Sequence, residues 1–229
     1  MLRTSLAALL LMTLQAPAPT FRAQVDHFVV AIRSLDEGVA AFERLTGVKP
    51  VAGGKHPNRG TENALVSLGP NTYLEVIAPQ KDAKLSPLDA PMRDLADLTV
   101  IGWAISVSNA EEAHARIVKA GMTPSPITGG SRVTPAGVTL EWQTFGLLTP
   151  QIDVAPFFIH WKEGTRHPST TSPKGCTLSK VEVRDPSAAD LTKVLTALGV
   201  QGVTVTNAPS AIRVSLTCPK GPVTLKTGD

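Results

Sequence analysis

Three side chains in the sequence could act together on a metal ion or a proton: His27, Glu75 and His160. Each lies inside a short apolar run, VDHFVVAI, TYLEVIA and PFFIHW respectively, and such runs are typical of β-strands. Strand side chains alternate between two faces, so each run points its titratable group away from its most apolar face. Taken singly, each residue is explained more simply as a hydrogen-bonded core or rim residue, but three equivalent placements favour one shared site.

Two imidazoles and one carboxylate suit a divalent ion such as Zn, Fe, Mn, Ni or Co. The ion would keep open positions for water or for a substrate oxygen. Glu75 has two alternative roles in such a site, because a carboxylate is either a metal ligand or the general base that takes a proton. Its side chain is therefore the first candidate for a catalytic residue.

The segment GGKHPNRGTEN, residues 53–63, gathers several polar side chains between glycines. As a binding loop it would use His56 to shuttle a proton and Arg59 to hold an anionic substrate group, with Asn63 as a further substrate contact. The alternative is a turn-rich crossover in which the Asn and Thr side chains only cap local backbone groups.

Trp103, Trp142 and Phe158 are candidates for the apolar wall of a substrate cup, because small-molecule pockets are mostly apolar. Strand aromatics are also common in plain hydrophobic core, and that alternative stays open for all three. His167 falls in a linker sequence, EGTRHPST, and we assign it no role.

The elements that would position these side chains recur along the chain. In residues 24–97 a strand is followed by the helix SLDEGVAAFERL, a Gly- and Pro-rich segment and further strands. Residues 98–165 repeat this order around the helix AEEAHARIVKA, and residues 174–229 repeat it as a third, partial βαββ module. The repetition predicts an α+β fold in which modules pair around a shared concavity.

The segment VDHFVVAIRSLDEGVAAFERLTGVKP, followed by GGKHPNRGTENALVSLGPNTYLEVIAP, resembles the glyoxalase-like branch of the vicinal oxygen chelate superfamily. The likeness covers about residues 24–163, and its most specific part is the HPNRGTEN loop together with YLEVIAP. The resemblance implies paired βαβββ modules and a metal cup formed by the first and last strands of both modules. On that mapping His27 and Glu75 come from the first module and His160 from the end of the second.

The resemblance leaves one position of the cup without a ligand, because this position falls at about Gly102 or Trp103. Glyoxalase I is expected to supply four protein ligands, so the sequence departs from that reaction type. A set of two histidines and one glutamate resembles instead the extradiol-dioxygenase type of the same superfamily. The superfamily also contains members that bind drugs or carry no metal, so the fold alone does not imply a reaction.

Composition restricts the classes of partner. The chain has 229 residues, of which 42% are hydrophobic and 18% charged, as in one compact body of about two lobes. The net charge is +3 and the Lys and Arg residues are scattered, so we expect no nucleic-acid partner. Beyond the N-terminal segment, no stretch is apolar enough for a membrane span.

The first 16 residues, MLRTSLAALLLMTLQA, have the layout of a secretory signal. We therefore expect residues 1–23 to be a signal peptide and leader, and the protein to be exported to the periplasm or secreted; an uncleaved apolar helix or a lipid-side anchor is the alternative. Cys176 and Cys218 fit one structural disulfide in an exported protein, or else two free buried thiols.

These residues lead to one main hypothesis and two alternatives. The main hypothesis is an exported glyoxalase-like protein with metal-assisted lyase, isomerase or dioxygenase chemistry on a small oxygen-bearing molecule. The first alternative is a protein that sequesters a small molecule in the same cup without turnover, and the second is a structural or interaction module. We expect the third unit either to pack across the first two or to leave a sheet edge that pairs into a homodimer.

Overall fold

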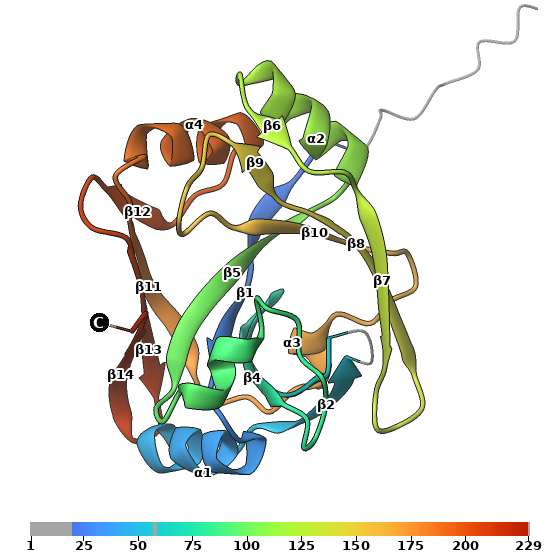
Figure 1. Ribbon diagram of the computed structural model, residues 1–229, viewed down its shortest axis with the longest axis vertical. Helices are drawn as coiled ribbons and strands as arrows, with labels where there is room; N and C mark the ends of the chain where they lie inside the picture. Colours follow the sequence, from blue (N-terminus) through green and yellow to red (C-terminus); the bar gives the residue numbers. More distant parts are fainter. Residues whose placement is uncertain (1–19, 57–58, 229) are drawn as a thin grey trace, which may run out of the picture.

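The computed structural model describes residues 20–56 and 59–228. The predicted leader, residues 1–23, lies outside this part of the chain except for its last four residues. Within the described residues, no helix has the length and apolar character that crossing a membrane requires. The molecule mixes α and β structure, as the sequence predicts, and strands dominate it (Figure 1).

The first module positions most of the polar side chains that later form the site. Its helix α1 ends where Gly47 takes a left-handed backbone conformation (φ 80°), which glycine adopts without a Cβ clash. The strand order is β1-β4-β3-β2, with β1 parallel to β4 and the other pairs antiparallel. The elements are β1 (Ala23–Ala31), α1 (Leu35–Thr46), β2 (Val51–His56), β3 (Thr61–Gly69) and β4 (Thr72–Pro79).

The second module repeats this arrangement. Its four main strands have the order β5-β10-β8-β7, again with the first strand parallel to the last. Helix α2 begins after Asn109, whose side chain accepts a hydrogen bond from the backbone N–H of Glu112 (2.7 Å). The elements, after the short helix η1 (Ala90–Asp94), are β5 (Thr99–Val107), α2 (Ala110–Lys119), β6 (Thr123–Pro124), β7 (Thr128–Val133), β8 (Thr139–Phe145), β9 (Leu147–Thr149) and β10 (Phe157–Trp161).

The two modules form one eight-stranded sheet, because β1 and β5 pair with each other in antiparallel orientation. The sheet curves until its edge strands, β2 and β7, approach each other (Figure 1). At this seam Arg132 Nη1 donates to the carbonyl oxygen of Gly53. A Cβ atom on Gly54 would meet the carbonyl oxygen of Val133 at 2.6 Å, so the two edges touch here. The sheet therefore has a concave interior bounded by both modules.

The third unit repeats the order of strand, helix and strands but not the strand pairing. Its first strand, β11, is an inner strand of a separate four-stranded sheet ordered β12-β11-β13-β14. In the two modules the first strand pairs with the last one instead. The unit has one strand more than the partial βαββ module that the sequence predicts. After the short helix α3 (Pro168–Thr171), its elements are β11 (Thr177–Arg184), α4 (Ala188–Leu198), β12 (Val203–Thr206), β13 (Ala211–Cys218) and β14 (Gly221–Lys226).

The third unit packs against the first two. Its helix α4 lies beside α2, and its strand β14 lies beside α1 and β5 (Figure 1). Val181, Leu191 and Leu216 of this unit belong to one continuous apolar core with Phe28 and Ile117 of the modules. Of the two arrangements expected for the third unit, packing across the first two modules is therefore present, and a homodimer stays a prediction.

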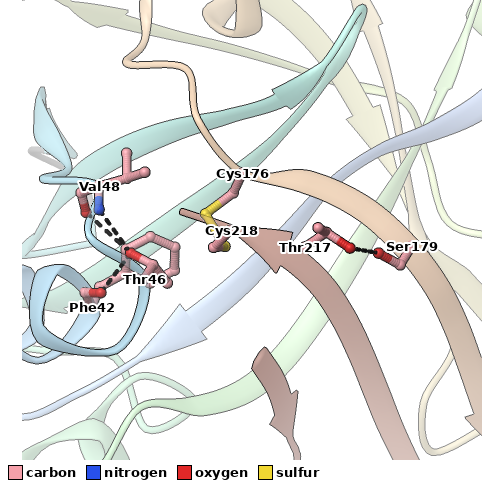
Figure 2. Close-up of a disulfide and its surroundings, with 7 residues drawn as sticks. All are labelled: Phe42, Thr46, Val48, Cys176, Ser179, Thr217 and Cys218. Carbon is pink, nitrogen blue, oxygen red and sulfur yellow. Dashed lines mark hydrogen bonds between the residues drawn. A yellow bond between two sulfur atoms is a disulfide. The ribbon is translucent and has the colours of Figure 1, made fainter. Parts of the chain in front are cut away.

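A disulfide joins Cys176, just before β11, to Cys218 at the end of β13, across a sequence separation of 42 residues (Figure 2). It lies near the turn that follows α1. In this turn Thr46 Oγ1 donates to the carbonyl oxygen of Phe42 (2.7 Å) and accepts from the backbone N–H of Val48 (3.1 Å). Of the two alternatives for the cysteines, the structural bridge is thus the one that forms.

Candidate functional site

The concave interior of the eight-stranded sheet holds a cavity of about 790 Å³, a size that suits a small organic molecule. Its two halves differ in chemistry. The first module supplies most of the titratable side chains, His27, His56, Arg59, Tyr73, Glu75 and Asp89, together with Asn63 and with apolar ones that include Val29, Leu88, Met92 and Leu95. The second module supplies all the tryptophan and phenylalanine side chains of the lining, Trp142, Phe145, Phe157 and Trp161, together with Ile101, Ile159, four hydroxyl side chains and one cation, Arg132.

Glu75, on β4, is the centre of the polar half. Asn63 Nδ2 donates to its Oε1 at 2.6 Å. Each carboxylate oxygen also faces an imidazole, with Oε2 3.8 Å from His27 Nε2 and Oε1 3.8 Å from His56 Nε2. Burial raises the pKa of Glu75, but His56, His27 and the hydrogen bond from Asn63 outweigh burial and leave this pKa below its ordinary value. The buried carboxylate is therefore ionised at neutral pH.

Asp26 is a fully buried carboxylate that accepts hydrogen bonds from three side chains. His27 Nδ1 lies 2.6 Å from its Oδ1, while His167 Nε2 (3.1 Å) and Trp161 Nε1 (3.0 Å) donate to Oδ2. Burial raises the pKa of Asp26, but the hydrogen bonds from His167 and His27 outweigh burial and lower the pKa to about 2. Asp26 is the extra residue at an irregularity in the pairing of β1 with β5. This irregularity lets Asp26 and His27 meet although they are consecutive in one strand.

His27 takes its orientation from Asp26. Because Asp26 is ionised, His27 Nδ1 must carry a proton and donate it to this carboxylate. A neutral His27 ring therefore presents an unprotonated Nε2 towards Glu75. Tyr73 stacks on the same ring with the two centroids 4.5 Å apart, which holds the imidazole plane in place.

His56, at the end of β2, faces Glu75 from the other side. Its Nδ1 lies 3.0 Å from Thr61 Oγ1, and its Nε2 lies 3.4 Å from Asn63 Nδ2. Since Asn63 Nδ2 is a donor, His56 Nε2 acts as an acceptor and Nδ1 carries the proton. Burial lowers the pKa of His56, although the negative charge of Glu75 opposes that effect. Glu75 thus lies between two imidazole rings, each with a nitrogen atom 3.8 Å from one of its carboxylate oxygens.

Arg59 lines the cavity but already has a carboxylate partner. Its Nη2 is paired with Asp89 Oδ1, and its Nε donates to Asp89 Oδ2 at 3.2 Å. Asp89 also accepts a hydrogen bond from Ser86 Oγ (2.9 Å). The side chain of Arg59 is 49% exposed. Asp89 therefore occupies part of the guanidinium group, and the role of Arg59 as the anchor of an anionic substrate group stays a prediction.

Two glycines make room for site side chains, one in each module. A Cβ atom on Gly53 of β2 would clash with Asn63 Oδ1, and one on Gly130 of β7 would clash with Trp142 Nε1. The buried Asn63 Oδ1 has no hydrogen-bond donor among the described residues and lies against the backbone of Gly53. Trp142 lies against the backbone of Gly130 and lines the cavity, and its role as a substrate contact stays a prediction.

The structure separates His160 from His27 and Glu75. On β10, Phe157 and Ile159 alternate towards the cavity, so His160 lies on the opposite face of the strand. There its Nδ1 donates to the carbonyl oxygen of Val107 at 3.0 Å. The expectation that His160 joins the metal set is therefore wrong, because strand alternation directs it away from the concave interior.

Trp103 and Phe158 also lie outside the cavity, in the hydrophobic core. Both are fully buried. Trp103 Nε1 donates to the carbonyl oxygen of Val154 (2.8 Å), and Phe158 stacks on Phe145 with the centroids 4.8 Å apart. The neighbouring residue, Gly102, takes the cavity-facing position on β5. Alternation thus selects the core alternative for both aromatic residues.

The residues present do not fit the metal cup that the resemblance implies. Imidazole Nε2 atoms and a carboxylate are suitable donor types, yet His27 and His56 face different oxygens of Glu75. In the part of the chain that the structure describes, no three His, Cys, Asp or Glu side chains gather as metal ligands would. The chemistry that this cluster can perform with its own groups is proton transfer.

Among the residues at the site that the sequence analysis did not propose are Asp26, Arg132, Trp161 and His167. Alternation on β10 contains a signal for Trp161, which shares the cavity-facing side of Phe157 and Ile159. The other three have no local signal. Asp26 meets His167 across a sequence separation of 141 residues, and Arg132 meets Gly53 across 79.

Comparisons with known proteins agree with this architecture. The sequence model of a family described as glyoxalase-like domain matches residues 25–199. The solved structure of a hypothetical protein from Staphylococcus aureus is 15% identical in sequence. The match covers 90% of this chain and 86% of that chain with a TM-score of 0.63, which shows that the two share a fold.

Smaller solved structures match part of the chain. Methylmalonyl-CoA epimerase from Mycobacterium tuberculosis is 17% identical, with 59% of this chain and 86% of that chain covered and a TM-score of 0.45. A hypothetical protein from Bacillus halodurans is 18% identical, with 63% of this chain and 98% of that chain covered and a TM-score of 0.48. No curated protein sequence matches the chain.

Proposed function

Because the chain belongs to the glyoxalase-like domain family, we propose that its cavity catalyses acid–base proton transfer on a small oxygen-bearing molecule, as an isomerase or lyase does. The observation that carries this proposal is the buried, ionised carboxylate of Glu75, which lies between the imidazole rings of His27 and His56. A general base needs an accessible lone pair at the pH of operation, and Glu75 has one facing the cavity.

In the proposed step Glu75 takes a proton from a carbon next to a carbonyl group, and the electrons of the C–H bond pass to the carbonyl oxygen as an enolate. The proton then returns to the substrate at the same or a neighbouring atom, so atoms and charge balance. Asn63 keeps Glu75 in place through its hydrogen bond, and Asp26 keeps His27 as a proton acceptor. His27 and His56 can hold the proton between the two transfers.

The test is deuterium exchange into a panel of dicarbonyl compounds and hydroxy acids, followed by proton NMR in D₂O. For any compound whose C–H exchange the protein accelerates, Glu75→Gln should lower the rate by about 10²-fold or more. Glu141→Gln is the matched control, because this exposed carboxylate on β8 lies outside the cavity and pairs with Lys162 (3.3 Å). Exchange that survives unchanged in Glu75→Gln contradicts the proposal.

Metal assistance is a separate part of the family expectation, and elemental analysis of the natively purified protein tests it. Wild type is compared with a triple variant, His27→Ala, His56→Ala and Glu75→Ala. About one equivalent of a divalent metal in wild type that is lost in the variant would show that the cluster rearranges to bind a cation. Full exchange activity in metal-depleted protein supports proton transfer by the side chains alone.

A second candidate function is sequestration of a small molecule without turnover. It is favoured by the apolar half of the cavity, where Trp142, Phe157 and Trp161 offer large contact surfaces. Saturable quenching of tryptophan fluorescence by a compound that shows no C–H exchange and no other conversion would support this function over catalysis.

We also propose that the protein is exported. The signal-like layout of residues 1–16 and the Cys176–Cys218 disulfide support this, because disulfides persist in oxidising compartments. Expression of the full chain in a Gram-negative host, with cell fractionation and intact-mass analysis, tests the proposal. A full-length, reduced chain in the cytoplasmic fraction alone contradicts it.

A further inference from the structure

Arg132 is a buried cation that the proposed reaction does not use. Its side chain extends from β7 into the cavity, and the residue is only 6% exposed. Among the described residues, no carboxylate lies within ion-pair distance of it. Arg59, the other arginine at the cavity, differs in both respects, because it is half exposed and paired with Asp89. A buried charge without a partner is costly unless another group compensates it.

The guanidinium group of Arg132 is held in a fixed position. Its Nη1 donates to the carbonyl oxygen of Gly53 across the seam between β7 and β2. A guanidinium group has five N–H donors, and this carbonyl is the one acceptor that it has among the described residues. The remaining donors are left to the cavity that the side chain lines. Fixed, unpaired N–H groups of this kind bind a carboxylate through two parallel hydrogen bonds.

The charges of the cavity restrict where an anion can bind. Glu75 is negative, so it repels an anion from the centre of the polar half. Arg132 is the cavity cation that forms no ion pair among the described residues, and Glu75 acts on its charge only from beyond ion-pair distance. The charge of Arg132 also extends to the cluster, because it contributes to the lowered pKa of both Glu75 and His56.

We propose that the cavity binds a small carboxylate with an apolar body, and that the carboxylate group is held by Arg132. The apolar body then lies against Trp142, Phe157 and Trp161 on the walls of the second module. This inference deepens the proposed function by naming the substrate class, and it rests on that function only where it places the reacting C–H group beside Glu75. Binding of the carboxylate by Arg132 is a separate, measurable property.

The experiment compares phenylacetate with its neutral analogue phenylacetamide, and it uses quenching of the cavity tryptophans as the readout. The protein as purified after export should bind phenylacetate at least about tenfold more tightly than phenylacetamide at constant ionic strength. In Arg132→Gln this preference should fall to about threefold or less. Glutamine removes the charge and keeps an uncharged N–H donor, on a shorter side chain, at this position of the seam.

Three further variants separate charge from structure. Arg132→Lys should keep part of the preference, because the positive charge remains without the planar guanidinium group. Arg59→Gln should leave the preference within about twofold of wild type, since Arg59 is already paired with Asp89. Glu75→Gln should retain or increase it, because a negative charge is removed.

Two outcomes overturn the inference. One is equal binding of the two probes by wild type, or binding of neither at millimolar concentration. The other is a wild-type preference that persists in Arg132→Gln. A preference that Glu75→Gln retains while C–H exchange is absent from every tested compound would instead contradict the proposed reaction and leave the carboxylate site standing.

Discussion

The first and second modules have the same fold and strand pairing, yet they bring different chemistry to the cavity, since the first supplies most titratable side chains and the second the tryptophan and phenylalanine side chains. Strands β1 and β4 of the first module present His27 and Glu75, whereas the corresponding strands β5 and β10 present Gly102, Phe157 and Ile159. The fold therefore decides where side chains meet, and each module's own sequence decides what they do there.

Among the variants that follow, Asp26→Asn should have the largest effect on the C–H exchange rate. A carboxamide cannot accept hydrogen bonds from two imidazoles as a carboxylate does, so His27 loses its fixed tautomer. We expect the C–H exchange rate to fall by about 10²-fold. Asp153→Asn, at an exposed aspartate of the second module that accepts from Ser210 (2.8 Å), should stay within about twofold of wild type. A wild-type rate in Asp26→Asn would show that the first module does not depend on this carboxylate.

A pair of tryptophan variants tests whether the apolar half also supports the polar half. Trp161 donates to Asp26, whereas Trp142 has no hydrogen-bond acceptor among the described residues. Trp161→Phe should lower the free energy of unfolding by about 2–3 kcal/mol, since a bond to a charged group is lost, and Trp142→Phe by about 1 kcal/mol. Urea unfolding measures both values. Equal losses would mean that the bond to Asp26 contributes nothing to stability.

The pH dependence of the free energy of unfolding tests the contribution of the same carboxylate, Asp26. The pKa of Asp26 is about 2 in the folded protein and 3.8 ordinarily, so its ionised form stabilises the folded state above about pH 4. This stabilisation, on the order of 2 kcal/mol, is lost as the pH falls through about 2. The free energy of unfolding should therefore fall less steeply between about pH 4 and pH 2 in Asp26→Asn than in wild type. Asp153→Asn should keep the wild-type slope.

The smallest effects are expected from the glycines that make room for side chains. Gly53→Ala should displace Asn63 and slow exchange, and Gly130→Ala should displace Trp142 and weaken phenylacetamide binding, each by about threefold to tenfold. Gly129→Ala is the matched control, because its Cβ atom would meet nothing within 4 Å, and it should be neutral or slightly stabilising. If Gly53→Ala affected only binding and Gly130→Ala only exchange, the division between the modules would be wrong.

Periodicity and element order were sufficient for the fold class. The alternation of VDHFVVAI and TYLEVIA placed His27 and Glu75 on cavity-facing sides, and the structure brings these two side chains together with His56 and Asn63. The same rule applied to PFFIHW puts His160 on the face of Phe158, which is the core side of β10. Local alternation does not predict which face of each strand lines the concave side of the sheet.

The sequence by itself therefore determined the βαβββ order, the residue types available for proton transfer and the pair of cysteines, because these depend on local periodicity and side-chain chemistry. Tertiary structure alone decided that the first strand of the third unit is an inner strand, that Asp26 bridges His27 and His167, and that Arg132 remains without an ion pair. The physical reason is the same in each case. Sheet curvature, an irregular strand pairing and contacts across more than seventy residues set these positions, and none of them leaves a periodic signal in the chain.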